Sequence, residues 1–379
     1  MTPIVVVGYN RPRSLARLLN SINAADFDSN DVLLIISIDK GDNQDVLQVA
    51  EDFDWKHGKK DIRYQPENLK LRKHILKCGD ISQEYGSVII LEDDLFVSKE
   101  FYRYATKALD FVKDDPKIGG VSLYNHLFNV NVCEPFSALP DGYDNWYFQF
   151  ASSWGQAWTA EQWKQFKLWY GDNNEKDITG YDIPVTVTSW SSSSWLKYFI
   201  KYLIVTDRYF LYPRESLTTN FSDAGTHAEY NGTNYQVPLQ VGEKEYRFST
   251  LKESKSVYDA FFENRYLSDM IGLDENVDID LYGSKQGHEY RYKLTSKILN
   301  YKILKGYARS MRPMDANIVY NIEGKEFFLY DTSISETNEY KVNQVQALEY
   351  CIRNYDKKTY KVFLKKFTRD LKNYIKKRI

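Results

Sequence analysis

Apolar runs and helical patterns alternate along the first 125 residues of the chain. Apolar runs predict strands at 3–9, 31–39, 61–65, 87–91 and 118–124. Between them, apolar positions at helical spacing predict helices at 13–22, 43–53, 71–82 and 98–112. Strands that are apolar on both faces and separated by helices are typical of a parallel sheet covered on both sides. The pattern therefore predicts an α/β fold with a mostly parallel sheet.

The regular alternation breaks down after Asn125. Residues 126–235 are rich in Trp, Ser and Gly, a composition that predicts loops and lids above a site. We therefore expect one domain at 1–235, made of the halves 1–125 and 126–235, followed by a smaller α/β extension at 236–345. The segment 346–379 places Phe363, Phe367, Leu371 and Ile375 four residues apart among lysines, which predicts a basic amphipathic helix.

Composition narrows the class of protein. Its 50 Lys and Arg nearly balance its 52 Asp and Glu, which argues against general nucleic-acid binding. From Cys351 to Ile379, however, eleven Lys or Arg face two Asp. The 31 Tyr would suit surfaces that stack on sugars, or they simply replace Phe in the core. Three widely spaced cysteines, Cys78, Cys133 and Cys351, fit neither a disulfide framework nor a zinc cluster and indicate a reducing compartment.

The chain begins with a predicted strand, Pro3–Val7, rather than with a basic leader and a cleavage site. No apolar run approaches the roughly 20 residues that span a bilayer. We therefore expect a cytoplasmic protein.

Polar residues follow three of the predicted strands. Tyr9, Asn10 and Arg11 follow the first, Asp39 and Lys40 the second, and the acid triplet Glu92–Asp94 the fourth. In parallel α/β sheets, ligands sit at the carboxyl ends of the strands. These residues are therefore expected to line one crevice.

Adjacent carboxylates repel one another unless something positive lies between them. Mg²⁺ and Mn²⁺ take oxygen ligands and are commonly held by one or two carboxylates plus substrate phosphates. Such a cation would neutralise a diphosphate leaving group, as in transfer from a nucleotide diphosphate sugar. The alternative is that the triplet only precedes the helix predicted to begin near Ser98 and favours its positive end.

Three segments carry a resemblance to a known family: "PIVVVGYNRP", "IISIDKGDNQDV" and "VIILEDDLFVSKEFYRYATKALDFVKDDPKIGGVSLYN". Together they resemble the catalytic domain of GT-A fold glycosyltransferases, which has a Rossmann-like sheet. The resemblance is closest to the inverting N-acetylglucosaminyltransferase that starts complex N-glycan branching and to bacterial transferases of surface-polysaccharide synthesis. It covers about residues 3–125, is patchy from 145 to 235, and does not extend further.

The resemblance implies roles for the residues at the strand ends. Asp94, the last acid of the motif, would hold Mn²⁺ or Mg²⁺ bridged to the nucleotide diphosphate, while Glu92 and Asp93 contact the donor. Asp39 would contact the uracil of a UDP-sugar, and Arg11, beside Tyr9, would reach the phosphates. The acceptor would be a glycan or a lipid-linked glycan.

The second half of the site departs from the family. "LYPRESLTTNFSDAGTHAEY" resembles the family's donor-covering loop, in which His227 would complete the metal shell or bond the diphosphate, or is an ordinary loop histidine. Relatives carry a Trp-Asp pair whose carboxylate takes the acceptor proton, but this chain has "SWSSSSW" there. A serine is no general base at neutral pH without help. Asp207 and Asp223, the nearest downstream acids, are the candidates for the base.

Three functions remain open: a metal-dependent, inverting sugar transferase, a sugar nucleotidyltransferase, and a non-catalytic carbohydrate-binding relative. The nucleotidyltransferase usually has a glycine-rich loop after the first strand, which "GYNRPRS" lacks. The basic helix would either lie on the anionic inner face of the plasma membrane or pack on the body through its apolar side chains.

Overall fold

The computed structural model describes the whole chain except residues 222, 224–234, 274, 288–289, 341–355 and 377–379. It contains two compact units. The first comprises Met1–Lys297 and Tyr301–Ser335, and the second comprises Ile298–Asn300 and Glu336–Ile379. Each is described by itself. Among the described helices, none combines the length and the apolar composition needed to cross a bilayer.

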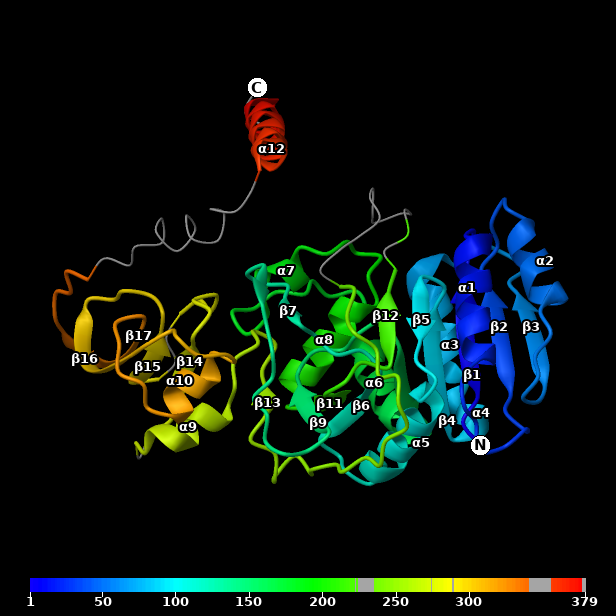
Figure 1. Cartoon of the computed structure of the whole chain (residues 1–379), viewed down its shortest axis with the longest axis horizontal. Helices are drawn as coiled ribbons and strands as arrows, with labels where there is room; N and C mark the ends of the chain where they lie inside the picture. The colour runs from blue at the N-terminus through cyan, green and yellow to red at the C-terminus, as the bar shows by residue number, and fades with distance from the viewer. Residues whose placement is uncertain (222, 224–234, 274, 288–289, 341–355, 377–379) are drawn as a thin grey trace. The chain divides into compact units, whose positions relative to one another are not determined.

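The first unit is built on a nine-stranded sheet in the order β13-β9-β11-β6-β10-β4-β1-β2-β3 (Figure 1). Its amino-terminal half has the predicted alternation of strands and helices. The strands are β1 (Ile4–Gly8), β2 (Leu34–Ile38), β3 (Lys60–Tyr64), β4 (Ser87–Glu92) and β6 (Ile118–Ser122). The helices are α1 (Pro12–Asn23), α2 (Asp45–Asp52), α3 (Lys70–Asp80), α4 (Ser82–Tyr85) and α5 (Phe101–Val112). The predicted α/β fold class is confirmed.

The segment 126–235 forms buried strands and helices as well as loops, whereas its composition predicts loops and lids. It supplies β9 (Asn145–Phe148), β10 (Gln156–Thr159) and β11 (Tyr209–Pro213) to the central sheet, and a further strand, β13 (Val257–Tyr258), lies beyond the expected boundary at 235. It also forms β7 (Phe128–Asn129), β8 (Glu134–Pro135), α6 (Ala160–Asn173), α7 (Val185–Thr188) and α8 (Leu196–Val205). Four of its tryptophans, Trp146, Trp158, Trp163 and Trp195, are core residues and almost wholly buried.

Alternate side chains of the strands pack in two hydrophobic cores, one on each face of the sheet. Ile4 and Val6 of β1 pack in the core that holds α1, α2 and α5. Val5 and Val7 face the opposite core, which holds residues of α3, α6 and α8. Burial on both faces explains why these strands read as continuous apolar runs.

A smaller sheet follows in the order β14-β15-β17-β16, and its strands are β14 (Val277–Asp280), β15 (Tyr292–Thr295), β16 (Tyr301–Tyr307) and β17 (Phe327–Ser335). Its core includes residues of α9 (Tyr266–Ile271) and α10 (Asp315–Val319). Buried polar contacts join it to the central sheet: Tyr258 of β13 donates a hydrogen bond to Asp315, and Asn264 Nδ2 lies 3.3 Å from Asp315 Oδ2. Within the first unit, these strands and helices therefore form an α/β element with its own core.

The second unit contains the helix α12 (Lys357–Lys376). This helix matches the basic amphipathic helix predicted near the end of the sequence.

We predict that Gly79→Ala destabilises the protein. A Cβ on Gly79 in α3 would lie 2.1 Å from the indole of Trp163 in α6, and this buried, stacked ring has no room to move. Overpacking of this kind costs about 1–3 kcal/mol, to be measured as a lower free energy of unfolding in urea. The matched control is Gly171→Ala on α6, where a Cβ would meet nothing within 4 Å, so that this change stabilises the helix by about 0.5 kcal/mol. Equal stabilities of the two variants would contradict the packing described here.

Candidate functional site

The register of the sheet brings the ends of β1, β2 and β4 to one edge. Gly8 of β1 pairs with Ile38 of β2, and Val7 pairs with Glu92 of β4, all in parallel. The backbone N–H of Asp39 donates to the carbonyl of Gly8 at 2.9 Å, and that of Asp93 donates to the carbonyl of Val7 at 3.1 Å. The residues that follow these strands therefore lie side by side, as the sequence pattern predicts.

Arg11 faces the acid triplet from the loop between β1 and α1. Its guanidinium forms an ion pair with Asp93, and its Nη2 atom lies 3.5 Å from Asp94 Oδ2. Asp93 is buried, whereas the Arg11 side chain is 26% exposed. One partly exposed cation thus balances three neighbouring carboxyl groups.

Two oxygens of the triplet are buried without a hydrogen-bond partner among the described residues: Glu92 Oε1 and Asp94 Oδ1. Burial, together with the charges of Asp94 and Asp93, raises the pKa of Glu92 well above its usual range. Burial also raises the pKa of Asp93 to about 6, although Arg11 opposes this shift. Because burying a carboxylate oxygen without a partner is costly, the two orphaned oxygens among adjacent acids make this the candidate site for a ligand or ion.

The triplet does not sit at a helix start. Strand β5 (Leu95–Val97) follows directly and pairs with β12 (Thr218–Asn220) in a separate two-stranded sheet. Helix α5 begins only at Phe101, and Ser98 accepts a hydrogen bond from the backbone N–H of Glu100 rather than capping the helix. The helix-end interpretation therefore does not account for the three acids.

The triplet fits a cation that is shared with a ligand. Among the described residues, no group of three or more His, Cys, Asp or Glu side chains could hold a metal ion by itself. Magnesium-type ions in enzymes are commonly held by one or two carboxylates, with the remaining ligands from phosphates and water. The orphaned Asp94 Oδ1 would suit such a partial shell, and Asp94 is the residue that would hold the ion.

A second part of the site lies at the end of β2. Asp39 Oδ1 accepts hydrogen bonds from the backbone N–H groups of Lys40 and Leu69, at 3.0 and 2.8 Å. Asn68 Nδ2 donates to the hydroxyl of Tyr9 at 3.2 Å and to the carbonyl of Lys40 at 3.0 Å. These bonds hold the 39% exposed Tyr9 beside a fixed, buried carboxylate. Such a pairing can stack on a planar ring and accept a hydrogen bond from its edge.

A buried polar network supports this part of the site. Ser37 Oγ lies 2.7 Å from His74 Nε2 and accepts from Gln65 Nε2 at 3.2 Å, and Gln65 Oε1 accepts from Lys77 at 2.7 Å. Burial lowers the pKa of His74 to about 4, so this imidazole is neutral. Sequence reasoning missed these residues and Asn68, because each is a single polar position within an otherwise ordinary strand, helix or loop.

The candidate base Asp223 lies near the triplet. The backbone N–H of Phe221 donates to the carbonyl of Asp94 at 2.9 Å, and the charge of Asp223 contributes to the raised pKa of Asp93. Its carboxylate is already engaged by the guanidinium of Arg17 and by Ser14 Oγ at 2.7 Å. Burial raises the pKa of Asp223, but these hydrogen bonds outweigh burial and leave the pKa below its usual value. A carboxylate held this way is a weak base.

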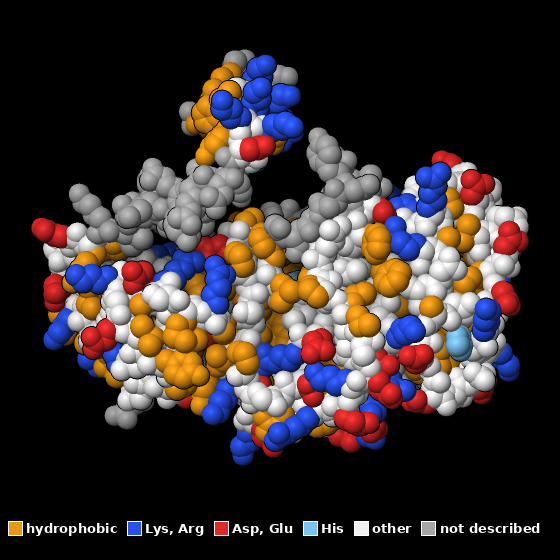
Figure 2. All heavy atoms as spheres, viewed as in Figure 1, with side chains coloured by type: hydrophobic (Ala, Val, Ile, Leu, Met, Phe, Trp, Pro, Cys, Tyr) orange, Lys and Arg blue, Asp and Glu red, His pale blue; other side chains and the backbone are white. Residues whose placement is uncertain are grey.

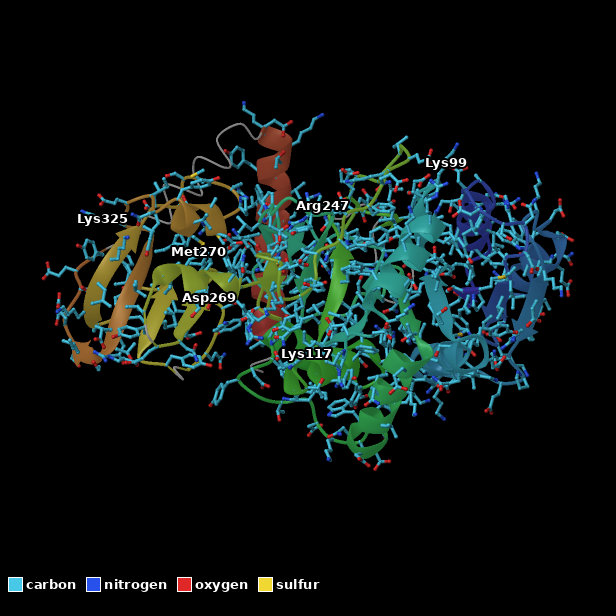
Figure 3. All side chains as sticks on the ribbon, turned by 90° about the horizontal axis from the view of Figure 1, so that it is seen from below. Lys99, Lys117, Arg247, Asp269, Met270 and Lys325 are labelled. Atoms are coloured by element: carbon cyan, nitrogen blue, oxygen red, sulfur yellow. The ribbon has the colours of Figure 1, made fainter. Side chains whose placement is uncertain are left out.

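Asp207, the other candidate base, is not brought to this edge. It precedes β11, which runs parallel to β6, and its carboxylate binds Lys117, at the start of β6, at 2.7 Å and Arg265 at 2.8 Å. Because β6 runs parallel to β4, these residues lie at the amino edge of the sheet, where Figure 3 labels Lys117. Asp207 is close to "SWSSSSW" in the sequence, but it lies at the opposite ends of the strands from the acid triplet.

The serines of that segment are exposed or half-buried and precede α8. Ser191 Oγ lies 2.9 Å from Ser193 Oγ, while the neighbouring Trp195 is buried in the core. His227, with Gly225 and Thr226, lies outside the described residues.

Two adjoining hollows of about 270 and 260 Å³ lie near α7. Both are lined by Val185, Phe261 and Ser284, and neither is lined by an acid of the triplet. These hollows are therefore separate from the candidate site at the acid triplet.

An aromatic cluster lies beyond the end of β6. The Trp154 ring lies 4.6 Å from that of Tyr235 and 4.8 Å from that of Tyr124, measured between centroids. Thr218 of β12 donates a hydrogen bond to the carbonyl of Trp154 at 2.5 Å, which links the cluster to the sheet that follows the triplet. The half-buried rings of Trp154 and Tyr235 can contact a sugar face, whereas Tyr124 is buried.

No protein-family model and no curated protein matches the sequence. Among solved structures, the TarS 1–349 fragment from S. aureus in complex with UDP is 15% identical, with a TM-score of 0.37 over 57% of this chain. The chain covers 60% of that fragment and 36% of a longer TarS structure.

Two further structures are similar over less of the chain. The mannosyltransferase PcManGT from Pyrobaculum calidifontis, in complex with GDP-Man and Mn²⁺, is 15% identical with a TM-score of 0.31, over 42% of this chain and 46% of its own. A cytidylyltransferase from Leptospira borgpetersenii is 11% identical with a TM-score of 0.28, over 46% of this chain and 72% of its own. At these scores, function has to be argued from the residues of this chain.

We predict that Arg11→Met destabilises the protein in a pH-dependent way. The folded-state pKa of Asp93, about 6, exceeds its reference value of 3.8, so ionising Asp93 in the folded protein costs stability as the pH rises through this range. Arg11 offsets part of that cost, and its removal should lower the free energy of unfolding by roughly 2 kcal/mol near pH 7.5. Near pH 4.5 Asp93 is protonated, and the difference should largely vanish.

Urea titrations at both pH values, without added divalent cations, measure this effect. Arg13→Met, at an exposed position of α1, is the control and should change stability little at either pH. A loss of stability in Arg11→Met that is as large near pH 4.5 as near pH 7.5 would rule out the charge balance described here.

Proposed function

We propose that this protein is a metal-dependent glycosyltransferase that binds a nucleotide diphosphate sugar at the carboxyl edge of β1, β2 and β4. The observation that carries the proposal is the acid triplet opposite Arg11, with two buried oxygens that lack a partner among the described residues. A divalent cation bound by a diphosphate would satisfy such a site, because it neutralises the carboxylates and supplies the missing ligand contacts.

We propose that different residues of the site contact different parts of the donor. Asp94 would hold Mn²⁺ or Mg²⁺, while Glu92 and Asp93 contact the ribose and the sugar. When bound, the cation supplies charge neutralisation for the departing diphosphate. Arg11 would add a second positive charge on the phosphates, and the 26% exposure of its side chain next to the acids supports this role. Tyr9 and Asp39 would contact the base, which we propose is uracil.

The sugar would pass to a glycan or a lipid-linked acceptor by direct displacement with inversion, in the synthesis of a surface polysaccharide. The acceptor hydroxyl needs a group that takes its proton. Asp223 stays the candidate on this edge of the sheet. It could act only if the bound acceptor or donor draws Arg17 away from its carboxylate, because that ion pair and the hydrogen bond from Ser14 hold its pKa low.

One observation favours a second candidate, a donor-binding relative that transfers no sugar. Serines 191–194 stand where similar enzymes have an acid, and Asp223 is already engaged. A sugar nucleotidyltransferase differs from both in its products, since it joins a nucleoside triphosphate to a sugar phosphate and releases pyrophosphate.

We expect Asp94→Ala to abolish release of UDP from a UDP-sugar in the presence of Mn²⁺. The variant lacks the oxygen that would hold the cation, so the rate should fall on the order of 100-fold or more. Asp114→Ala, at an exposed acid after α5, is the matched control and should keep the full rate. The assay measures free UDP over a panel of UDP-sugars, with thermal unfolding as a check on folding.

Full UDP release by Asp94→Ala would show that the metal assignment is wrong. Binding of the UDP-sugar without UDP release from the unmodified chain would favour the non-transferring relative. Release of pyrophosphate from a nucleoside triphosphate and a sugar phosphate would favour the nucleotidyltransferase.

A further inference from the structure

The helix α12 has a continuous apolar face. At about 100° per residue, Leu364, Phe367, Leu371 and Ile375 fall on one side, and the aromatic residues of the helix fall on the same arc of about 120°. The four aliphatic and phenyl side chains are 64%, 64%, 47% and 48% exposed. A stripe of this size is a typical interaction surface rather than a scatter of single apolar residues.

The opposite face of α12 is basic. The helix carries eight Lys or Arg and a single acid, Asp370, which pairs with Lys366. Six of the cations, Lys358, Lys361, Lys365, Lys366, Arg369 and Lys372, fall on the arc away from the apolar stripe. Figure 2 shows the two faces of this helix separately, with the hydrophobic side chains on one side and the Lys and Arg side chains on the other.

We propose that α12 binds in the plane of an anionic lipid bilayer, with its apolar face in the headgroup region and its cations against the lipid phosphates. A strongly charged face opposite bulky apolar side chains is the pattern of helices that lie on a membrane. Anionic lipids attract the basic residues, which snorkel their ammonium groups toward the headgroups. This property is separate from sugar transfer and depends only on the residues of α12.

A second copy of the chain is the competing occupant. Tyr360, Leu364, Phe367, Leu371 and Tyr374 alternate in steps of four and three, which also fits a coiled-coil seam. Two such helices would, however, bring sixteen cations together against two acids, whereas an anionic bilayer neutralises them. Charge complementarity therefore favours the bilayer.

Vesicle flotation of the full chain tests the proposal. The unmodified chain should float with vesicles of phosphatidylcholine and phosphatidylglycerol, should float less with phosphatidylcholine alone, and should detach as salt rises. The double variant Phe367→Ser/Leu371→Ser should lose roughly tenfold or more in partitioning to the anionic vesicles, because both side chains belong to the apolar face. Lys365→Glu/Arg369→Glu should remove the preference for anionic lipid.

The matched control is Val362→Ser. Val362 is 63% exposed, as the stripe residues are, but it lies among the cations, so this variant should bind as the unmodified chain does. Sedimentation velocity without vesicles measures self-association of all the variants. The proposal is overturned if the unmodified chain does not bind anionic vesicles, or if both serine variants bind equally. It is also overturned if Phe367→Ser/Leu371→Ser abolishes a dimer without changing vesicle binding.

Discussion

The arrangement of this site depends on the repulsion among three carboxyl groups at the end of a buried strand. The parallel register of β4 with β1 fixes Glu92 opposite Val7, and Asp93 and Asp94 follow it directly in the sequence. Arg11 is the cation paired with Asp93 and Asp94. Burial raises the pKa values of Glu92 and Asp93 and leaves two oxygens without a described partner. A fold accepts such a cost where the same groups bind something positive.

The sheet organises the rest of the site around this cluster. Asp39 and Tyr9 are held at the neighbouring strand ends by backbone and Asn68 hydrogen bonds, so they keep their geometry without a ligand. The antiparallel pairing of β5 with β12 brings the segment before Asp223 next to Asp94. A hydrogen bond from Thr218 of β12 to the carbonyl of Trp154 links this pair to the aromatic cluster. Hydrogen bonds thus hold the side chains that we propose for donor binding, whereas Asp223, the proposed base, is paired with Arg17.

The sequence predicted the strands and helices of residues 1–125 well, because local patterns of apolar and polar residues determine them. Strands 3–9, 31–39 and 87–91 are apolar on both faces, and the rule for parallel sheets then places Arg11, Asp39 and Asp94 together. It failed for 126–235, where β9, β10 and β11 are short, aromatic and paired with strands far away in sequence. Asp207 was misplaced for the same reason, since the direction of β11 is set by pairing with β6.

The central claim is that the strand-end acids bind a nucleotide diphosphate sugar through a divalent cation. Thermal unfolding of the chain with a panel of UDP-, GDP- and CDP-linked sugars, each with Mn²⁺ and with EDTA, tests it most directly, because a ligand that binds only the folded state raises the melting temperature. We predict a rise with at least one UDP-sugar in Mn²⁺ that disappears in EDTA. No rise with any donor, or the same rise in EDTA, would contradict the account.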